Sequence, residues 1–124
     1  VTVKGAASRK AAKILARSVV SSNLVKAAIF GSDANWGRIL CALGYSGESF
    51  DPTRVEIYFS AGYKQIKIAE NGMAVNYSEE EASEILSEKA ITITADLHSG
   101  NHSATAWGCD LTYDYVKING DYRS

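Results

Sequence analysis

The sequence is poor in cysteine and histidine, the residues that stabilise small disulfide-rich or metal-binding proteins. Its 124 residues include one proline, two cysteines and two histidines. Two cysteines cannot build a disulfide framework, and two cysteines with two histidines make a poor set of zinc ligands. We therefore predict no metal site, and we expect Cys41 and Cys109 to be reduced, buried side chains.

An excess of charge of one sign is also missing. The chain has 13 Lys and Arg residues against 14 Asp and Glu residues, a formal net charge of −1. Proteins that bind nucleic acid normally gather a basic excess on one face. No apolar run approaches the ~20 residues of a membrane span, and residues 1–20 lack the apolar block of a signal peptide. These features argue against nucleic-acid and membrane binding and favour a soluble, cytoplasmic protein.

What is present is the composition of a globular protein. Hydrophobic residues make up 46% of the chain and charged residues 22%, with no internal repeat, linker or low-complexity segment. Size scaling buries roughly two thirds of the surface of a chain of this length, enough for a core without disulfides or metal. We predict one domain covering residues 1–124.

Two helices with capped starts are expected. Ser8 precedes apolar residues at helical spacing, which predicts a surface helix over residues 8–21. Ser78 opens the run Ser-Glu-Glu-Glu, a capping box that places carboxylates at the positive end of a helix dipole. That second helix is expected to run to about residue 88.

The segment between these helices is less regular. Residues 22–30 are apolar but too short for periodicity to separate helix from strand. A turn follows, in which Asp33 or Asn35 caps a short buried helix over residues 39–43, ended by Gly44.

Alternating apolar and polar residues predict several strands. They are expected at residues 1–3, 55–59, 64–69, 73–75, 90–97 and 103–107. Asn71-Gly72 is the strongest hairpin signal, and the polar turn His98–Asn101 is expected to return the chain as a neighbouring strand. Gly5 is expected to turn the chain after the first strand, and residues 109–124 allow a final helix or an extended wrap. This order predicts an α+β fold with a mixed or antiparallel sheet and helices packed on one face.

No complete catalytic set is evident in the residues themselves. Asp96, Ser99 and His102 crowd one predicted turn, where local hydrogen bonds explain all three. An N-terminal nucleophile requires Ser, Thr or Cys at position 1, which is Val1. We assign no catalytic residue in this chain.

Two further clusters have structural explanations. The carboxylates at positions 79–84 fit helix capping and solvation rather than a metal or acid/base pair. Residues 31–38 match neither glycine-rich phosphate-binding pattern, and their tryptophan and two glycines favour a packed turn over ligand contact. Ligand contact through Arg38 stays open as the alternative.

Three stretches resemble one family. Residues 22–38, SNLVKAAIFGSDANWGR, resemble the SxLVKTAxFGxDxNWGR segment of the ornithine acetyltransferase (glutamate N-acetyltransferase) family of arginine biosynthesis. Residues 109–124, CDLTYDYVKINGDYRS, are similar to that family's C-terminus, CDLTYDYVKINADYR[ST]. Residues 1–6, VTVKGA, are similar to the strand that follows its GEGATK motif. The likeness spans the whole chain in order.

The resemblance implies the C-terminal domain of the β chain of a larger, α/β-layered, self-processing enzyme. Members are made as one precursor that cleaves itself before a threonine, producing α and β chains. That threonine carries the acetyl group in a ping-pong transfer from N-acetylornithine to glutamate, and some members also use acetyl-CoA; no resident cofactor is implied. The nucleophile would lie before Val1, so this segment alone is expected to be inactive. Its implied partners are the α chain and the N-terminal part of the β chain, in an α2β2 assembly.

The resemblance carries a substrate-contact role to two residues, Asn119 and Ser124. An amide that donates and accepts, together with a hydroxyl, suits small zwitterionic substrates. Without the resemblance, Asn119 is a turn residue before Gly120, and Ser124 a frayed terminus. Gly120 stands where the family usually has alanine, which loosens the segment that aims Asn119.

Other matching residues have no assigned catalytic role. These are Asp33, Asn35, Trp36 and Arg38, and we hypothesise a structural or interchain role for them, with Trp36 as an interface anchor. A different class of function stays open: a non-catalytic small-molecule binding or interaction module that shares the domain.

Overall fold

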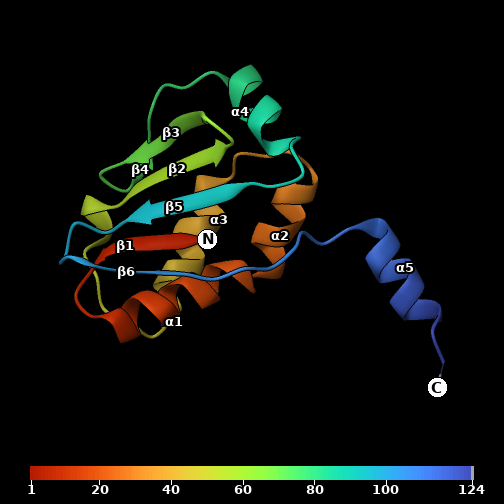
Figure 1. Ribbon diagram of the computed structural model, residues 1–124, viewed down its shortest axis with the longest axis horizontal. Helices are drawn as coiled ribbons and strands as arrows, with labels where there is room; N and C mark the ends of the chain where they lie inside the picture. Colours follow the sequence, from red (N-terminus) through yellow and green to blue (C-terminus); the bar gives the residue numbers. More distant parts are fainter. Residues whose placement is uncertain (124) are drawn as a thin grey trace.

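A six-stranded mixed sheet forms the centre of the computed structural model, which describes residues 1–123 (Figure 1). The strands are β1 (Thr2–Ala6), β2 (Glu56–Ala61), β3 (Lys64–Glu70), β4 (Met73–Ala74), β5 (Thr92–Asp96) and β6 (His102–Thr105). Their order across the sheet is β4-β3-β2-β5-β1-β6. β1 and β5 run parallel, and the other neighbouring strands run antiparallel. The predicted α+β class with a mixed sheet is confirmed.

Four helices cover one face of this sheet, as predicted. They are α1 (Arg9–Val20), α2 (Asn23–Phe30), α3 (Trp36–Gly44) and α4 (Glu79–Leu86). A short 3-10 turn, Pro52–Arg54, precedes β2, and a final helix, α5 (Tyr113–Asp121), lies apart from the sheet (Figure 1). The buried side chains of α1 to α4 belong to the same hydrophobic cluster as the inward-facing strand residues. One core therefore lies between the sheet and these helices.

Strand β2 illustrates why the two faces of the sheet differ. Ile57 and Phe59 are buried against the helices, whereas Glu56, Tyr58 and Ser60 alternate with them on the outer face. Because successive side chains of a strand point to opposite faces, this alternation leaves the outer face polar. Burial of each large apolar side chain contributes about 1.5–3 kcal/mol to folding.

The helices begin where hydroxyl and amide side chains cap them. Ser8 Oγ accepts from the Ala11 N–H at 3.0 Å, and Ser78 Oγ accepts from the Glu81 N–H at 3.2 Å, which confirms both predicted starts. The ambiguous residues 22–30 form helix α2. Ser22 caps α2 by accepting from the Val25 N–H, although no capping signal was predicted at this position.

The position of β6 corrects one prediction. The polar turn after β5 suggests that the next strand pairs with β5, but β1 lies between them. Thr2 is paired with Thr94 of β5 in parallel and with Thr105 of β6 in antiparallel register. The reason is a long-range pairing: β1 comes from the other end of the chain, so no local turn signal reveals it.

Gly5 lies inside β1 and does not turn the chain out of the sheet, contrary to the expectation from the sequence. It stays inside β1 with φ +67°, at a register shift between Val3 and Ala6. A Cβ at Gly5 would lie 2.5 Å from Asp96 Oδ1 and 2.7 Å from the His98 nitrogen. The left-handed backbone of glycine is therefore needed where β1 passes the end of β5.

Both cysteines are exposed, so the prediction of two buried thiols is wrong. Cys41 lies on the solvent side of α3, whose buried residues include Ala42 and Leu43. Cys109 follows β6 in an extended segment that leaves the sheet. Within residues 1–123, no helix is long and apolar enough to cross a membrane.

Candidate functional site

Asn119 lies in the last turn of the exposed helix α5. Thr112 caps this helix by accepting from the Tyr115 N–H at 2.9 Å, and the helix has no buried residue. The Asn119 side-chain amide donates to the backbone oxygen of Tyr115 at 2.9 Å. Asn119 is therefore helical, and its reading as a turn residue before Gly120 is wrong. The other predicted substrate contact, Ser124, lies outside the described residues.

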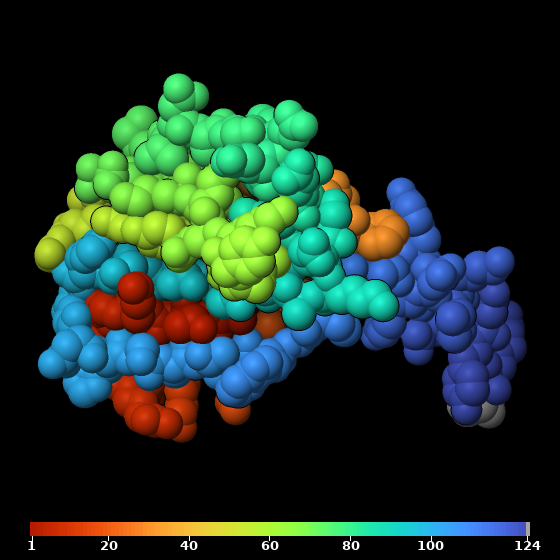
Figure 2. Space-filling view, turned by 45° about the horizontal axis from the view of Figure 1, so that its top comes forward, coloured from red at the N-terminus to blue at the C-terminus, as the bar shows by residue number. Residues whose placement is uncertain are grey.

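Residues 106–123 form a C-terminal arm that stands out from the body of the molecule (Figures 1 and 2). An extended stretch leads from β6 to α5. Two contacts hold it to α2: the Leu111 N–H donates to the Lys26 carbonyl oxygen at 3.3 Å, and the rings of Phe30 and Tyr113 meet edge to face. The arm thus has a fixed base and an exposed end.

The arm also carries a concentration of exposed apolar side chains. These are Trp107, Tyr113, Tyr115, Val116, Ile118 and Tyr122, each more than half exposed. Tyr115, Ile118 and Asn119 follow the i, i+3, i+4 spacing that places residues on one face of a helix. Asn119 is therefore presented on an apolar face of α5, and exposed apolar surfaces of this kind mark contact with other protein or with ligand.

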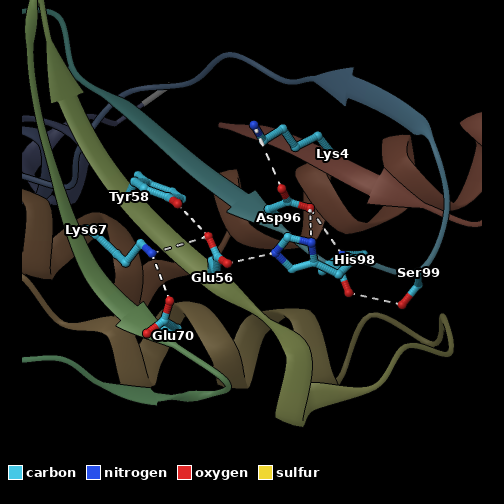
Figure 3. Close-up of polar contacts among 9 residues, drawn as sticks. Lys4, Glu56, Tyr58, Lys67, Glu70, Asp96, His98 and Ser99 are labelled. Carbon is cyan, nitrogen blue, oxygen red and sulfur yellow. Dashed lines mark hydrogen bonds and ion pairs between the residues drawn. The ribbon is translucent and has the colours of Figure 1, made fainter.

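A second group of polar residues, the outer-face cluster, lies on the sheet face opposite the helices (Figure 3). It consists of Glu56, Tyr58, Lys67, Asp96 and His98. His98 Nε2 lies 2.9 Å from Glu56 Oε1, and its Nδ1 lies 3.7 Å from Asp96 Oδ1. The Tyr58 hydroxyl donates to Glu56 Oε2, and Lys67 Nζ lies 3.7 Å from the same oxygen.

The hydrogen bond between Tyr58 and Glu56 governs the electrostatics of the outer-face cluster. It holds the pKa of the Glu56 carboxyl below its ordinary value. Partial burial raises this pKa, whereas His98 and Lys67 lower it further, and the net shift is downward. The same bond raises the pKa of the Tyr58 hydroxyl. Each partner therefore stabilises the protonation state that the other has at neutral pH.

The outer-face cluster does not contain the geometry of a catalytic triad. The backbone N–H of His98 donates to Asp96 Oδ1 at 3.1 Å, and the Ser99 hydroxyl donates to the Leu97 carbonyl oxygen at 3.1 Å. His102 begins β6 and is paired with Ala6. The serine hydroxyl is thus held by backbone. The local turn hydrogen bonds predicted for Asp96 and Ser99 are present, whereas His102 lies in strand β6 and not in the turn, so the prediction is wrong for His102. The contact of His98 with Glu56 spans 42 positions, and the sequence contains no local signal for it.

Residues 31–38 form a packed turn that joins α2 to α3. Asn35 Oδ1 accepts from the Arg38 N–H at 3.1 Å, and its Nδ2 donates to Asp33 Oδ2 at 3.1 Å. The Arg38 guanidinium donates to the Leu24 carbonyl oxygen at 2.9 Å. Trp36 is partly buried against the core. The polar groups of this motif therefore form the cap of α3 and its link to α2, the packed turn that the sequence favours.

In the described part of the chain, no group of three or more His, Cys, Asp or Glu side chains is placed to hold a metal ion. The exposed apolar face of the C-terminal arm is a feature open to a partner or ligand.

Comparison with solved structures defines the class of protein. The fold matches part of an arginine biosynthesis bifunctional protein from Bacillus halodurans, with a TM-score of 0.90 and 45% sequence identity. The match covers 98% of this chain and 55% of that chain. The sheet, helices and arm thus resemble one portion of that protein.

The sequence comparisons identify the family. The ArgJ family model matches residues 1–124, and the chain belongs to the ArgJ family. The arginine biosynthesis bifunctional protein ArgJ 1 of Clostridium acetobutylicum is 56% identical over 122 residues, which are 98% of this chain and 30% of that protein. A relative from Schizosaccharomyces pombe, named as mitochondrial, is 48% identical and matches 100% of this chain and 28% of its own length. The chain spans about 30% of the curated relatives it matches. The family inferred from the three sequence stretches is confirmed.

Proposed function

We propose that this chain is the C-terminal domain of the β chain of a self-processing, α/β-layered acetyltransferase. The enzyme moves the acetyl group of N-acetylornithine to glutamate through an acetyl-threonine intermediate, and the threonine lies in a part of the protein before Val1. The present segment completes the substrate pocket. Family membership over the whole chain supports the class of reaction, and the apolar face of α5 that presents Asn119 supports the role of this segment.

The chemistry of Asn119 fits a contact to a small zwitterion. Its amide nitrogen already donates to the Tyr115 carbonyl oxygen, which orients the side chain and leaves the amide oxygen as an acceptor. An amide oxygen accepts from a substrate ammonium group without adding charge. Ser124 is the second proposed contact, where a hydroxyl supplies both a donor and an acceptor.

The proposed partners follow from the same assignment. They are the α chain and the N-terminal part of the β chain, assembled as α2β2, and no nucleic acid or membrane is involved. Acetyl-CoA is a second acetyl donor in the bifunctional form of this activity. We propose the cytoplasm as its compartment, since Cys41 and Cys109 are free and exposed, as thiols are in a reducing environment.

Deletion of residues 119–124 from the whole enzyme tests the role of this segment. We expect a higher KM and a lower kcat/KM with self-cleavage unchanged, because the deleted residues contact substrate and not the processing site. Asn119→Ala should show the same trend, and Lys117→Ala, exposed on the opposite side of α5, is the matched control. Unchanged kinetics in both the deletion and Asn119→Ala would contradict the assignment.

An assay of acetyl transfer separates this function from the non-catalytic alternative. The whole protein is incubated with glutamate and either N-acetylornithine or acetyl-CoA, and N-acetylglutamate is measured. We expect product from N-acetylornithine with the whole protein, and none with residues 1–124 alone. A whole protein that binds these amino acids but forms no product would instead be a binding module.

A further inference from the structure

A groove of about 570 Å³ opens at the start of β1, beside the base of the C-terminal arm. One wall is formed by residues 87–91, which lead into β5, and the other by residues 106–110, which follow β6. Helices α1 and α2 form the floor, through apolar side chains that include Val19, Val25 and Ile29. We call this groove the strand slot.

The strand slot lies in line with β1. Val1 exchanges two backbone hydrogen bonds with Ala106, each 2.8 Å long. On its other side, β1 is paired with β5 in parallel. The two walls of the slot are therefore continuations of the two neighbours of β1. Two such neighbours stand about 9.5 Å apart, which leaves room for one strand between them.

The wall after β6 has backbone groups suited to a strand. Among residues 1–123, no backbone acceptor is found for the N–H groups of Trp107, Gly108 and Cys109. Gly108 packs closely against Val20, since a Cβ at this glycine would lie 2.9 Å from Val20 Cγ2. The wall is thus fixed on α1. Because Val1 and Ala106 form a hydrogen-bonded pair, the Gly108 N–H is the amide of this wall that faces the slot, and such a free amide pairs readily with an added strand.

We propose that the strand slot holds the segment that immediately precedes Val1 in the whole protein, running as a continuation of β1. This inference rests on the proposed function, in which the chain is one part of a longer β chain. The length outside this chain is large, since the C. acetobutylicum relative is matched over only 30% of its length.

The pairing of β1 with β6 sets the register of the added strand. Thr2 is opposite Thr105 and Val3 is opposite Ala104, so the third residue before Val1 lies opposite Cys109. Val1 and Val3 point toward the helices, and side chains alternate along a strand. The second residue before Val1 therefore faces the apolar floor and is expected to be apolar.

Occupation of the slot has a consequence for the proposed substrate contact. The added strand would bond to the backbone of Gly108, in the stretch that connects β6 to α5. It would therefore fix the base of the C-terminal arm and the direction in which α5 presents Asn119. The upstream segment and the substrate-contacting end of the chain are in this way mechanically coupled.

Disulfide trapping in the whole protein tests the register. Each residue in the stretch before Val1 is replaced in turn by cysteine, the protein is oxidised gently, and disulfides are mapped by mass spectrometry. We expect the strongest cross-link to Cys109 from the third residue before Val1, because opposite residues in antiparallel strands have the Cα separation of a disulfide. Cys109→Ser should abolish it, and Cys41, exposed on α3 outside the slot, is the internal control.

Cross-links to Cys41, to a second copy of the chain, or from positions unrelated to this register would overturn the proposal. If a cysteine variant fails to fold, hydrogen exchange of the unaltered whole protein gives a second measurement. The amide of Gly108, which faces the slot in this register, should then exchange as slowly as the paired amides of β6, and fast exchange there would also overturn the proposal. Acetyl transfer by the unaltered parent is assayed alongside. An inactive parent whose cysteine variants cross-link in the expected register would count against the proposed function alone, and an active parent whose variants do not cross-link in that register would count against this inference alone.

Discussion

The rings of Phe30 and Tyr113 meet edge to face, with their centroids 5.3 Å apart and their planes at 89°. Phe30 ends α2, and Tyr113 begins α5. This pair is a side-chain contact through which α5 rests on α2. The direction of α5, and with it the position of Asn119, therefore depends on one aromatic contact and a backbone hydrogen bond at Leu111.

Phe30→Ala in the whole enzyme should raise KM and lower kcat/KM. Edge-to-face pairs contribute about 0.5–1.5 kcal/mol beyond burial, which corresponds to roughly a 2- to 12-fold effect if the arm must be in place for substrate binding. Steady-state kinetics of acetyl transfer measure it. Tyr63→Ala, which removes an exposed aromatic ring from the turn between β2 and β3, is the control. Equal kinetics for the two variants would show that the contact does not position the arm.

Tyr58→Phe should lower stability at neutral pH by about 1 kcal/mol, a value reduced from that of a buried charged hydrogen bond because the pair is partly solvated. The pKa of Glu56 is lowered from 4.5 in the folded state. The stabilisation that ionised Glu56 provides is therefore complete above the unfolded-state pKa of 4.5 and is lost as the pH falls through the lower folded-state pKa. The difference between variant and parent should shrink in acid.

At alkaline pH, the stabilisation from Tyr58 is lost as the pH rises, the reverse of the behaviour of Glu56 in acid. The pKa of Tyr58 is raised from 10.0, so its contribution is complete below that value and is lost as the pH rises through the folded-state pKa. Thermal unfolding of the parent, Tyr58→Phe and the control Tyr45→Phe, measured across the pH range, tests both limbs. A pH-independent difference would mean that the Glu56–Tyr58 bond does not contribute.

Gly5→Ala should destabilise the fold more than Gly47→Ala. Both glycines have a left-handed backbone, at φ +67° and +90°, which costs other residues about 1–3 kcal/mol. Only at Gly5 does a Cβ also collide with Asp96 and His98, whereas nothing lies within 4 Å at Gly47. Chemical denaturation of the two variants gives the difference. Equal losses would indicate that the end of β5 moves aside at little cost.

Local patterns predicted most of the secondary structure because the signals and the elements occupy the same few residues. Ser8 and Ser78 cap helices where expected, and the Asn71-Gly72 turn connects β3 to β4. Asn35, one of the two proposed caps, caps α3. The exposure of Cys41 was missed because a short apolar helix does not show which side faces the core.

The candidate site was predicted only in part. Asn119 was identified through its family motif, but not its helical conformation or its apolar face on an arm away from the sheet. The contact of His98 with Glu56 joins positions far apart in the chain. Such contacts depend on which strands become neighbours, and the order of strands cannot be predicted from any short stretch of the sequence.

The sequence by itself determined the family, the α+β class and the starts of the main helices, since motifs, periodicity and caps are properties of neighbouring residues. Only the tertiary structure decided that β1 inserts between β5 and β6, that the outer face gathers Glu56, Tyr58 and His98, and that the C-terminal arm leaves the core. The physical reason is that these outcomes depend on long-range strand pairing and on how much apolar surface the sheet and helices can bury together. Those quantities exist only once the chain has folded.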